Sequence, residues 1–259
     1  MIFKSDKFIF NGINSEEMGI RLVDSQTRDI LNEYSIPFAE TIKIENSFNG
    51  NPLYTYEYSA PEKVELEFCL ANDYGKAYEW TQAWEEKIVS WFMQDKFCEF
   101  ISMDYPDLVY YLKGTKVSRK RDKELKGMMI VEFQPYFKHP IRKLKKSVFS
   151  NGEIEFLLNC DSSYKDLIYP IIKVEPTGKG KLEIKNLSIA DSESLIINDL
   201  ENEEKLIIDN NIYLVVNDKE QNMFHKVNRE WFKFRAGKNK IRITGNAKVE
   251  FLANIEVRV

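Results

Sequence analysis

The chain has 259 residues, of which 43% are hydrophobic and 13% aromatic, enough to fill one large β domain or two smaller ones. Its formal net charge is −4. Residues 1–150 carry 21 Lys+Arg and 23 Asp+Glu, and residues 151–259 carry 16 and 18, so each half is at −2. This even distribution argues against a basic, nucleic-acid-binding half.

The first predicted elements are short strands of an antiparallel meander. The residues Lys7–Phe10 alternate weakly between polar and apolar side chains. Asn11-Gly12 follows and predicts a tight turn, because glycine readily takes positive φ. Residues 19–24 and 28–34 are predicted as further strands or connectors.

A turn and two strand patterns follow between residues 45 and 68. The turn is predicted at Asn49-Gly50-Asn51-Pro52, which combines a turn dipeptide with a helix breaker. Tyr54, Tyr56 and Tyr58 share one face if their segment is extended. Residues 64–68 then alternate apolar and acidic side chains, which predicts a half-buried strand.

The segment from Asp73 to Gln94 is the best predicted helix, with Asp73 as its expected N-cap. Apolar side chains recur in it at helical spacing. They are Ala77, Trp80, Trp84, Ile88 and Trp91. This stripe predicts a helix that packs onto a sheet with Trp84 on its buried face; ligand stacking by the tryptophans is the alternative.

Further strands are predicted after this helix. Residues 97–101 and 109–112 read as strands on either side of the turn Asp104-Tyr105-Pro106-Asp107. Val117 and residues 128–133 are predicted to pair as a hairpin. Its tip, residues 119–127, is basic overall. The tip is predicted either as a solvated turn or as a contact with a neighbouring subunit or nucleic acid.

A domain boundary is predicted between residues 137 and 150. Pro135 and Pro140 break regular structure, and Arg142, Lys143, Lys145 and Lys146 resemble a basic linker. The predicted domains are therefore residues 1–140 and residues 141–259. A protease is expected to cut within Lys138–Lys146.

Many short strand patterns separated by turn residues occupy the second domain, and they predict an all-β sandwich. They cover Ile154–Leu158, Ile171–Glu175, Lys181–Leu187, Ser194–Asn198, Lys205–Asp209, Ile212–Val216, Trp231–Phe234, Lys240–Thr244 and Lys248–Val259. The fold class predicted for the whole chain is mainly β, with one long helix and an extended hairpin in the first domain.

Residues that could carry catalysis or bind a metal are few. His139 and His225 have no Cys, Asp or Glu at a recognisable metal-ligand spacing. Gly178-Lys179-Gly180-Lys181 lacks the spacing of a phosphate-binding loop and is predicted as a β-hairpin turn. The acidic residues between Asp199 and Glu204 resemble a solvated loop more than a calcium site. No catalytic, cofactor-binding or metal-binding residue is therefore predicted.

Three cysteines stand far apart, at Cys69, Cys98 and Cys160. Their number is odd and their neighbours are apolar, so they are predicted to be buried free thiols. The start of the chain has no signal-peptide pattern, and no apolar run approaches the length of a bilayer span. The cytosol is the expected site of folding, without membrane insertion.

The order of several motifs resembles the distal tail proteins of long-tailed bacteriophages that infect Gram-positive hosts. The opening residues Phe10-Asn11-Gly12 with Met18-Gly19 fit the family's first strand and turn. Its middle is matched by the tryptophan-bearing helix and Tyr105-Pro106-Asp107. Two C-terminal features match it as well, namely residues 206–209 and residues 234–241.

The resemblance implies a structural protein of the virion tail tip rather than an enzyme. Members of the family form a homohexameric ring that joins the tail tube to baseplate or tail-fibre proteins, and DNA passes through it without specific binding. Their C-terminal domains resemble galectin-like or carbohydrate-binding-module-like sandwiches. Synthesis is expected in the host cytoplasm, and a tail-like bacteriocin would share these features.

Two segments of the first domain are predicted to form the subunit contact, residues 48–58 and residues 115–129. Both combine strand-forming flanks with charged or aromatic tips, which suits extension of one subunit's sheet by the next. The candidate interface residues are Phe48, Tyr54, Tyr56, Tyr58, Arg119, Lys120, Arg121 and Met128. The pore is expected to have a neutral or acidic lining, because basic residues would hold passing DNA.

Two other functions remain open. The first is a carbohydrate-binding adhesion protein that uses the C-terminal sandwich and exposed aromatic residues such as Tyr213 or Trp231 to bind host-surface glycans. The second is a cell-wall hydrolase, which the missing nucleophile and metal motifs disfavour. The chain has no insertion large enough for an added sugar-binding module, so direct binding of host sugar is less expected.

Overall fold

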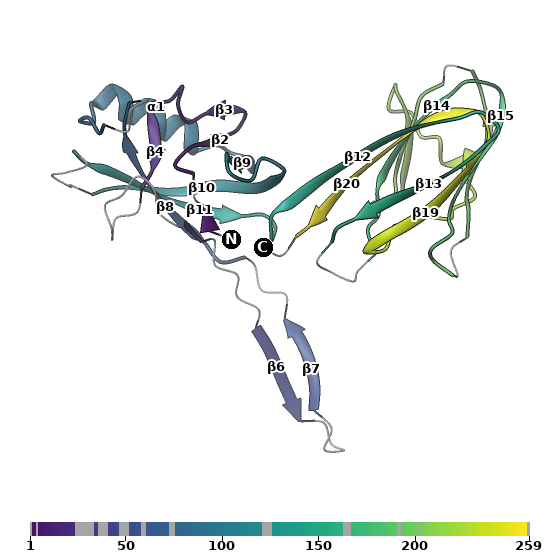
Figure 1. The fold of residues 1–259 in the computed structure, drawn as a ribbon, viewed down its shortest axis with the longest axis horizontal. Helices are drawn as coiled ribbons and strands as arrows, with labels where there is room; N and C mark the ends of the chain where they lie inside the picture. The colour runs from purple at the N-terminus through teal and green to yellow at the C-terminus, as the bar shows by residue number, and fades with distance from the viewer. Residues whose placement is uncertain are drawn as a thin grey trace. The chain divides into compact units, whose positions relative to one another are not determined.

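The computed structural model describes residues 2–3, 5–23, 34–35, 41–46, 52–57, 61–72, 76–120, 126–162, 167–190, 193–202 and 204–257. These residues fall into two compact units, divided between Pro140 and Ile141 (Figure 1). Both units are built mainly from antiparallel strands, and the first contains the helix α1. The predicted mainly-β fold class is confirmed.

An antiparallel sheet forms the body of the first unit. Its strands are paired in the order β10–β11–β8–β4, while β9 joins β10 to β2 and β2 pairs with β3. These strands are β2 (Phe8–Phe10), β3 (Ile13–Asn14), β4 (Ile20–Leu22), β8 (Val64–Leu70), β9 (Cys98–Ser102), β10 (Leu108–Lys120) and β11 (Met128–Pro135). Two separate pairs are β1 (Ile2–Phe3) with β5 (Tyr34–Ser35), and β6 (Thr41–Asn46) with β7 (Pro52–Glu57).

Strand β8 has the alternation expected from its sequence. Val64, Leu66 and Phe68 are buried, whereas Glu65 is exposed and Glu67 is partly exposed. The predicted hairpin is also confirmed, because Val117 pairs with Val131 and Lys120 with Met128. Most of the predicted strand 28–34 lies outside the described residues.

The helix α1 spans Gln82–Phe92 and is shorter than predicted. Its N-cap is Thr81, whose side chain accepts a hydrogen bond from the backbone N–H of Trp84. The expected N-cap Asp73 lies outside the described residues. The predicted start of the helix is nevertheless wrong, because α1 begins at Gln82. Ala77 forms a bridge to Ala71, and Tyr78 N–H donates to the carbonyl of Leu70, so this segment follows the sheet instead.

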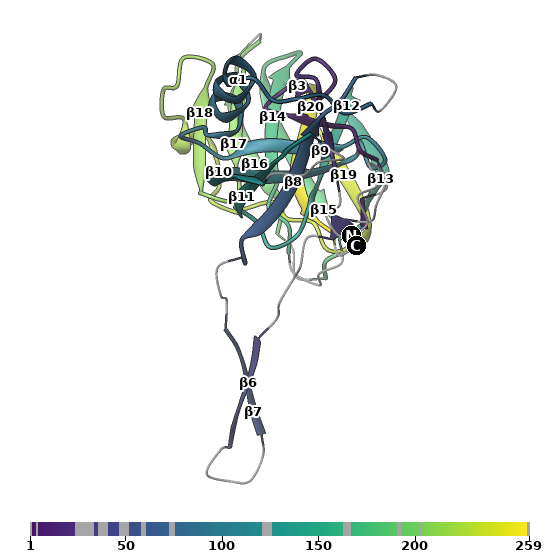
Figure 2. The ribbon, with the colours of Figure 1, turned by 90° about the vertical axis from the view of Figure 1, so that its left-hand side faces the viewer.

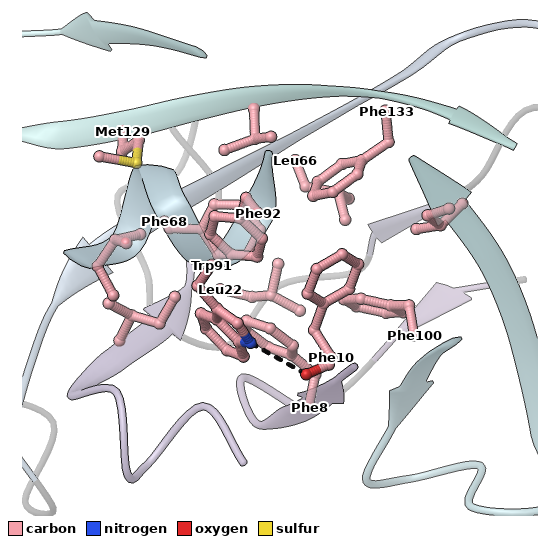
Figure 3. Close-up of a cluster of buried hydrophobic side chains, with 14 of the residues drawn as sticks. Phe8, Phe10, Leu22, Leu66, Phe68, Trp91, Phe92, Phe100, Met129 and Phe133 are labelled. Carbon is pink, nitrogen blue, oxygen red and sulfur yellow. Dashed lines mark hydrogen bonds between the residues drawn. The ribbon is translucent and has the colours of Figure 1, made fainter. Parts of the chain in front are cut away.

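Helix α1 lies across one face of the sheet (Figure 2) and buries Ile88, Trp91 and Phe92 against it. Trp91 is 5% exposed, and its indole N–H donates to the carbonyl of Phe10 at 3.1 Å (Figure 3). Trp84 packs against the same core, on the face predicted for it, but it is only partly buried. The helix therefore covers the core mainly with its last two turns.

The second unit contains two sheets that enclose a common core. One has the strand order β12–β20–β14–β17–β18, and the other has the order β13–β19–β15–β16. Phe251 of the first sheet contacts Phe156 of the second, with ring centroids 6.0 Å apart. The strands are β12 (Ile141–Ser150), β13 (Glu153–Cys160), β14 (Ile171–Pro176), β15 (Gly180–Asn186), β16 (Leu195–Leu200), β17 (Leu206–Asp209), β18 (Leu214–Asn217), β19 (Gly237–Thr244) and β20 (Ala247–Glu256), with the short helix η1 (Phe224–Lys226).

Three sequence-based expectations for this unit are wrong. The supposed basic linker is the strand β12, which pairs with β20 along its whole length. Residues 231–234 form no named strand, although Phe234 bridges to Ile168. The turn at residues 178–181 is not a hairpin within one sheet, because it joins β14 to β15 and these strands belong to different sheets.

We expect trypsin to spare Lys143, Lys145 and Lys146 while it cleaves the chain elsewhere, because β12 must leave its ladder before a protease can bind it. The exposed turn residue Lys219 serves as the internal reference. Mass spectrometry of early fragments measures the order of cleavage. Cleavage in β12 before Lys219 would show that the β12–β20 ladder opens readily.

Candidate assembly surfaces

The far end of the β10–β11 hairpin is held against the helix. Arg119 Nη1 lies 2.6 Å from Glu85 Oε1 of α1. Nearby, Trp80 Nε1 donates to the carbonyl of Gly127 at 3.1 Å. Gly127 has a φ of +110°, and a Cβ there would lie 3.2 Å from the Trp80 ring. These two contacts fix the hairpin to the helix and to the segment that precedes it.

The predicted interface residues of this hairpin have different surroundings. Met128 is 1% exposed and packs with Val23, Cys69 and Ala71, so its side chain has no surface for another subunit. This corrects its assignment as an interface residue. Arg119 is half exposed and engaged by Glu85, whereas Lys120 is exposed; Arg121 lies outside the described residues.

The β6–β7 pair is the second predicted contact segment. Its register places Tyr54 opposite Ile44 and Tyr56 opposite Ile42. Among the described strands, β6 and β7 pair only with each other. The predicted contact residues Phe48 and Tyr58 lie outside the described residues. The role of this pair in assembly stays a prediction.

A charged group lies on the outer face of the first unit's sheet. Glu132 accepts hydrogen bonds from Lys63 Nζ and Thr115 Oγ1, each at 2.7 Å. The bond from Lys63, and then the bond from Thr115, holds the pKa of Glu132 below its usual range. Glu65 lies beside Glu132 in the adjacent strand. Because Lys63 is ion-paired with Glu132 and Lys116 lies opposite Glu132 in β10, this face presents acidic and basic side chains together.

Within the part of the chain that the structure describes, no group of three His, Cys, Asp or Glu residues could hold a metal ion. The acidic residues at the end of β16 are instead engaged by lysines. Glu204 Oε2 lies 2.6 Å from Lys226 Nζ, and Glu201 Oε2 lies 2.7 Å from Lys179 Nζ.

The three cysteines are buried free thiols, as predicted. Burial raises the pKa of Cys69 and of Cys160 to about 12, and it raises the pKa of Cys98 as well. Because thiolates are the reactive form, these side chains stay inert as nucleophiles at neutral pH. In the described parts of the chain, no helix is both long and apolar enough to cross a membrane.

The aromatic residues named for glycan binding lie together in the second unit. The ring centroids of Tyr213 and Trp231 are 5.0 Å apart. No short-range pattern joins them, since Tyr213 precedes β18 and Trp231 follows η1. The contacts of Trp80 with Gly127 and of Arg119 with Glu85 were likewise missed, because each joins residues far apart in the chain.

Both units are rich in β-strands. In the first, side-chain contacts hold the end of the β10–β11 hairpin, and the cysteines of both units are buried. Residues 3–135 match the family model described as a phage tail protein N-terminal domain, and residues 141–253 match the one described as a phage tail C-terminal domain. The chain therefore belongs to this family of phage tail proteins. This confirms the class of tail protein inferred from the sequence and makes the chain a virion component.

Solved structures show the same fold. The crystal structure of phage SPP1 Dit (gp 19.1), described as a paradigm of the hub adsorption apparatus in phages infecting Gram-positive hosts, has 10% identity and a TM-score of 0.65. The match covers 96% of this chain and 98% of that chain. It shows that this tail protein has the fold of a distal tail hub protein.

A second similar fold comes from the activated phage P2 baseplate with Ca. That chain has 12% identity and a TM-score of 0.52, over 92% of this chain and 91% of its own length. A chain of the same baseplate with Sr has 11% identity and a TM-score of 0.52, over 97% and 98%. No functionally curated protein sequence matches the chain.

Proposed function

We propose that the protein is the distal tail subunit of a virion and forms a homohexameric ring, mainly through residues 1–137. The ring would join the tail tube to baseplate or tail-fibre proteins, and DNA would pass through it without specific binding. The observation that carries this proposal is the match of both units to phage tail domains, together with the hub fold over 96% of the chain. The proposed role is structural, not enzymatic, and synthesis is proposed in the host cytoplasm.

A ring requires a heterologous contact, in which two different patches of one subunit meet those of its neighbours. We propose the β10–β11 hairpin end and the β6–β7 pair as these patches. The contacts of Glu85 with Arg119 and of Trp80 with Gly127 support a role for the hairpin in the interface. A hairpin that is already held in place loses less conformational entropy when a neighbouring subunit binds it. Pairing with Glu85 also neutralises Arg119, which reduces its attraction for phosphate groups.

Two exposed lysines test the hairpin's role. We expect Lys120→Glu combined with Lys126→Glu to shift the full chain from rings to smaller species, because charge at a contact changes association strongly. Both residues are exposed at the hairpin end, so the melting temperature should stay near that of the parent. Native mass spectrometry and electron microscopy measure the number of copies.

The matched control is Lys219→Glu combined with Lys238→Glu, which makes the same charge change on exposed residues of the second unit. This variant should assemble like the parent. A parent chain that stays monomeric at every concentration would overturn the ring. If both double variants form rings equally well, the hairpin is not part of the contact between subunits.

The second candidate function is a carbohydrate-binding adhesion protein that acts through the C-terminal sandwich. The observation in its favour is the contact between Tyr213 and Trp231 at the surface of that unit. As a sole function, it predicts a glycan-binding chain that forms no ring. The same mass measurement separates it from the distal tail role.

A further inference from the structure

Strand β13 ends one sheet of the second unit, and its outer edge carries no further strand. It pairs with β19 from Glu153 opposite Thr244 to Cys160 opposite Gly237, without a register shift (Figure 1). In the part of the chain that the structure describes, β13 pairs with no other strand. A regular edge of eight residues is a template for another strand, because its outward backbone groups are unpaired.

Hydrogen bonds of β19 show which backbone groups of β13 face outward. Lys240 lies opposite Leu157. Its carbonyl accepts from Leu187 N–H at 2.7 Å and its N–H donates to Ser188 Oγ at 2.8 Å, both on the β15 side of β19. The two residues therefore form a non-hydrogen-bonded pair, and the N–H and carbonyl of Leu157 point away from β19. The backbone groups of the residues two positions before and after Leu157 point the same way.

The other end strands of this sandwich are covered or carry repelling charge. Residues 221–223 run beside β18, and residues 227–228 run beside β16, each with backbone hydrogen bonds to its strand. Strand β12 carries exposed Lys143, Lys145 and Lys146, and lysine on an edge discourages pairing. Strand β13 contains no lysine, proline or bulge, and no segment among the described residues pairs with its outer edge.

The side chains of β13 favour apolar neighbours at two places. Phe156 faces the core, where its ring centroid lies 6.0 Å from that of Phe251, yet Phe156 and Ile154 on the same face are partly exposed. The inward side chains of an added strand would cover them. On the outer face, Leu157 is 69% exposed. An apolar side chain beside Leu157 would remove part of it from water.

The charges beside Leu157 are acidic. The side chain of Glu153 is 58% exposed and lies 3.9 Å from Arg242 Nε. Glu155 accepts hydrogen bonds from Lys240 and then Arg242, which hold the pKa of its carboxyl below the usual range, so it stays ionised at neutral pH. β13 itself has no basic residue. A basic side chain on an added strand would therefore meet opposite charge, whereas an acidic one would be repelled.

We propose that the outer edge of β13 binds an extended segment of a partner protein as an additional strand. The segment has apolar side chains on its inward face and at least one basic side chain near Glu153 on its outer face. Backbone hydrogen bonds to the edge supply affinity, and the alternating side chains supply specificity. This inference goes beyond the proposed ring, whose contacts lie in residues 1–137, and it does not depend on ring formation.

A second copy of this chain is the competing occupant. Two paired β13 strands would bring together two glutamates from each copy and no basic residue from either strand. Such a pair lacks the opposite charges that a basic segment supplies. The charge of the edge therefore favours a different protein over a second copy.

Short peptides with blocked ends test the proposal directly. The first alternates lysine and valine, the second alternates glutamate and valine, and the third is the lysine peptide with N-methylated lysines and valines. Fluorescence anisotropy of the labelled peptides measures binding to the full chain up to millimolar concentration. The lysine peptide is expected to bind, and the other two to bind roughly tenfold or more weakly, because one has the wrong charge and the other cannot donate backbone hydrogen bonds.

Two variants of the chain probe the edge itself. Proline is tolerated in an edge strand where its nitrogen faces outward, so Leu157→Pro should keep the β13–β19 ladder while it blocks the added strand. It should bind the lysine peptide roughly tenfold or more weakly than the parent. Glu153→Lys changes an exposed side chain, should fold like the parent, and should shift the preference toward the glutamate peptide. The second variant decides the outcome if Leu157→Pro does not fold.

The matched control is Glu183→Lys, which makes the same charge change on β15, a strand with neighbours on both sides. It should bind all three peptides like the parent. Equal binding of the lysine and glutamate peptides, no binding of the lysine peptide, or unchanged binding by folded Leu157→Pro would overturn the proposal. Self-association of the parent that Leu157→Pro abolishes without peptide would assign the edge to a second copy instead. Copy number on the same samples should otherwise match the parent, so a failed ring and a failed strand site are distinguishable.

Discussion

Trp91→Ala should unfold or severely destabilise the first unit. The indole is 5% exposed, contacts Phe8 and Phe92 with centroids 5.9 and 4.9 Å away, and donates a hydrogen bond to the carbonyl of Phe10. Loss of a buried Trp costs about 3–5 kcal/mol, and loss of its hydrogen bond adds to this. A domain has only about 5–15 kcal/mol of net stability. Chemical denaturation followed by fluorescence measures the change.

Trp84→Ala is the internal comparison for this prediction. Trp84 lies on the same helix, and the Lys87 ammonium lies over its ring, but the side chain is only partly buried. Fewer of its atoms leave water on folding, so its loss should cost clearly less than that of Trp91. Equal losses from the two variants would contradict the assignment of Trp91 as the main anchor of α1.

The helix shows where sequence periodicity succeeds and where it fails. Ile88 and Trp91 follow the predicted helical stripe, because α1 buries one face against a sheet. Ala77 and Trp80 fit the same period but lie before the helix. Pairing of Ala77 with Ala71 decides this, and a contact with a strand cannot be read from helical spacing.

Strand β12 shows that amino-acid composition, like helical spacing, can mislead a prediction of secondary structure. Its exposed lysines and flanking Pro140 resemble a linker, yet every residue from Ile141 to Ser150 has a partner in β20. That partner lies about a hundred residues later in the chain, so no local pattern reveals it. In contrast, residues 64–68 of β8 alternate between buried and more exposed side chains, and the sequence predicts this part of the strand well.

The candidate contact residues were predictable only as segments. A hairpin with a basic end follows from residues 115–129, but the sequence does not say that Glu85 engages Arg119 or that Met128 is buried. The contact between Tyr213 and Trp231 joins residues far apart in the chain, so no short-range pattern predicts it.

Residues 234–241, which carried part of the family resemblance, owe their spacing to a buried amide network. Gly237 has a φ of +82°, which favours glycine. Asn239 is fully buried; its Nδ2 donates to the carbonyls of Arg235 and Gly237, each at 2.9 Å, and its Oδ1 accepts from Arg235 N–H at 2.9 Å. One side chain thus closes the connection that leads into β19.

A second buried amide completes this network. Asn186 Nδ2 donates to Asn239 Oδ1 and to the carbonyl of Lys233, each at 2.9 Å. Asn186 Oδ1 accepts from Ser188 N–H at 3.1 Å. The network therefore joins the end of β15 to the connection before β19, and it spans segments that no short-range pattern relates.

Asn239→Ala should destabilise the second unit by about 3 kcal/mol or more, because each buried polar group left without its partner costs roughly 1–3 kcal/mol. Lys238→Ala, on the exposed neighbour, should change the free energy of unfolding by less than about 0.5 kcal/mol. Denaturant titration of the full chain measures both. A small loss for Asn239→Ala would mean that water replaces these hydrogen bonds at little cost.

The double variant Asn186→Ala with Asn239→Ala tests whether the two amides act as one unit. After Asn239 is removed, Asn186 has already lost its bond to the Asn239 amide oxygen, so the second substitution should cost less than it does alone. A coupling of about 0.5–3 kcal/mol is expected for residues in one hydrogen-bond network. Strictly additive losses would show that the two side chains stabilise β15 and β19 independently, and that the spacing of residues 234–241 needs another explanation.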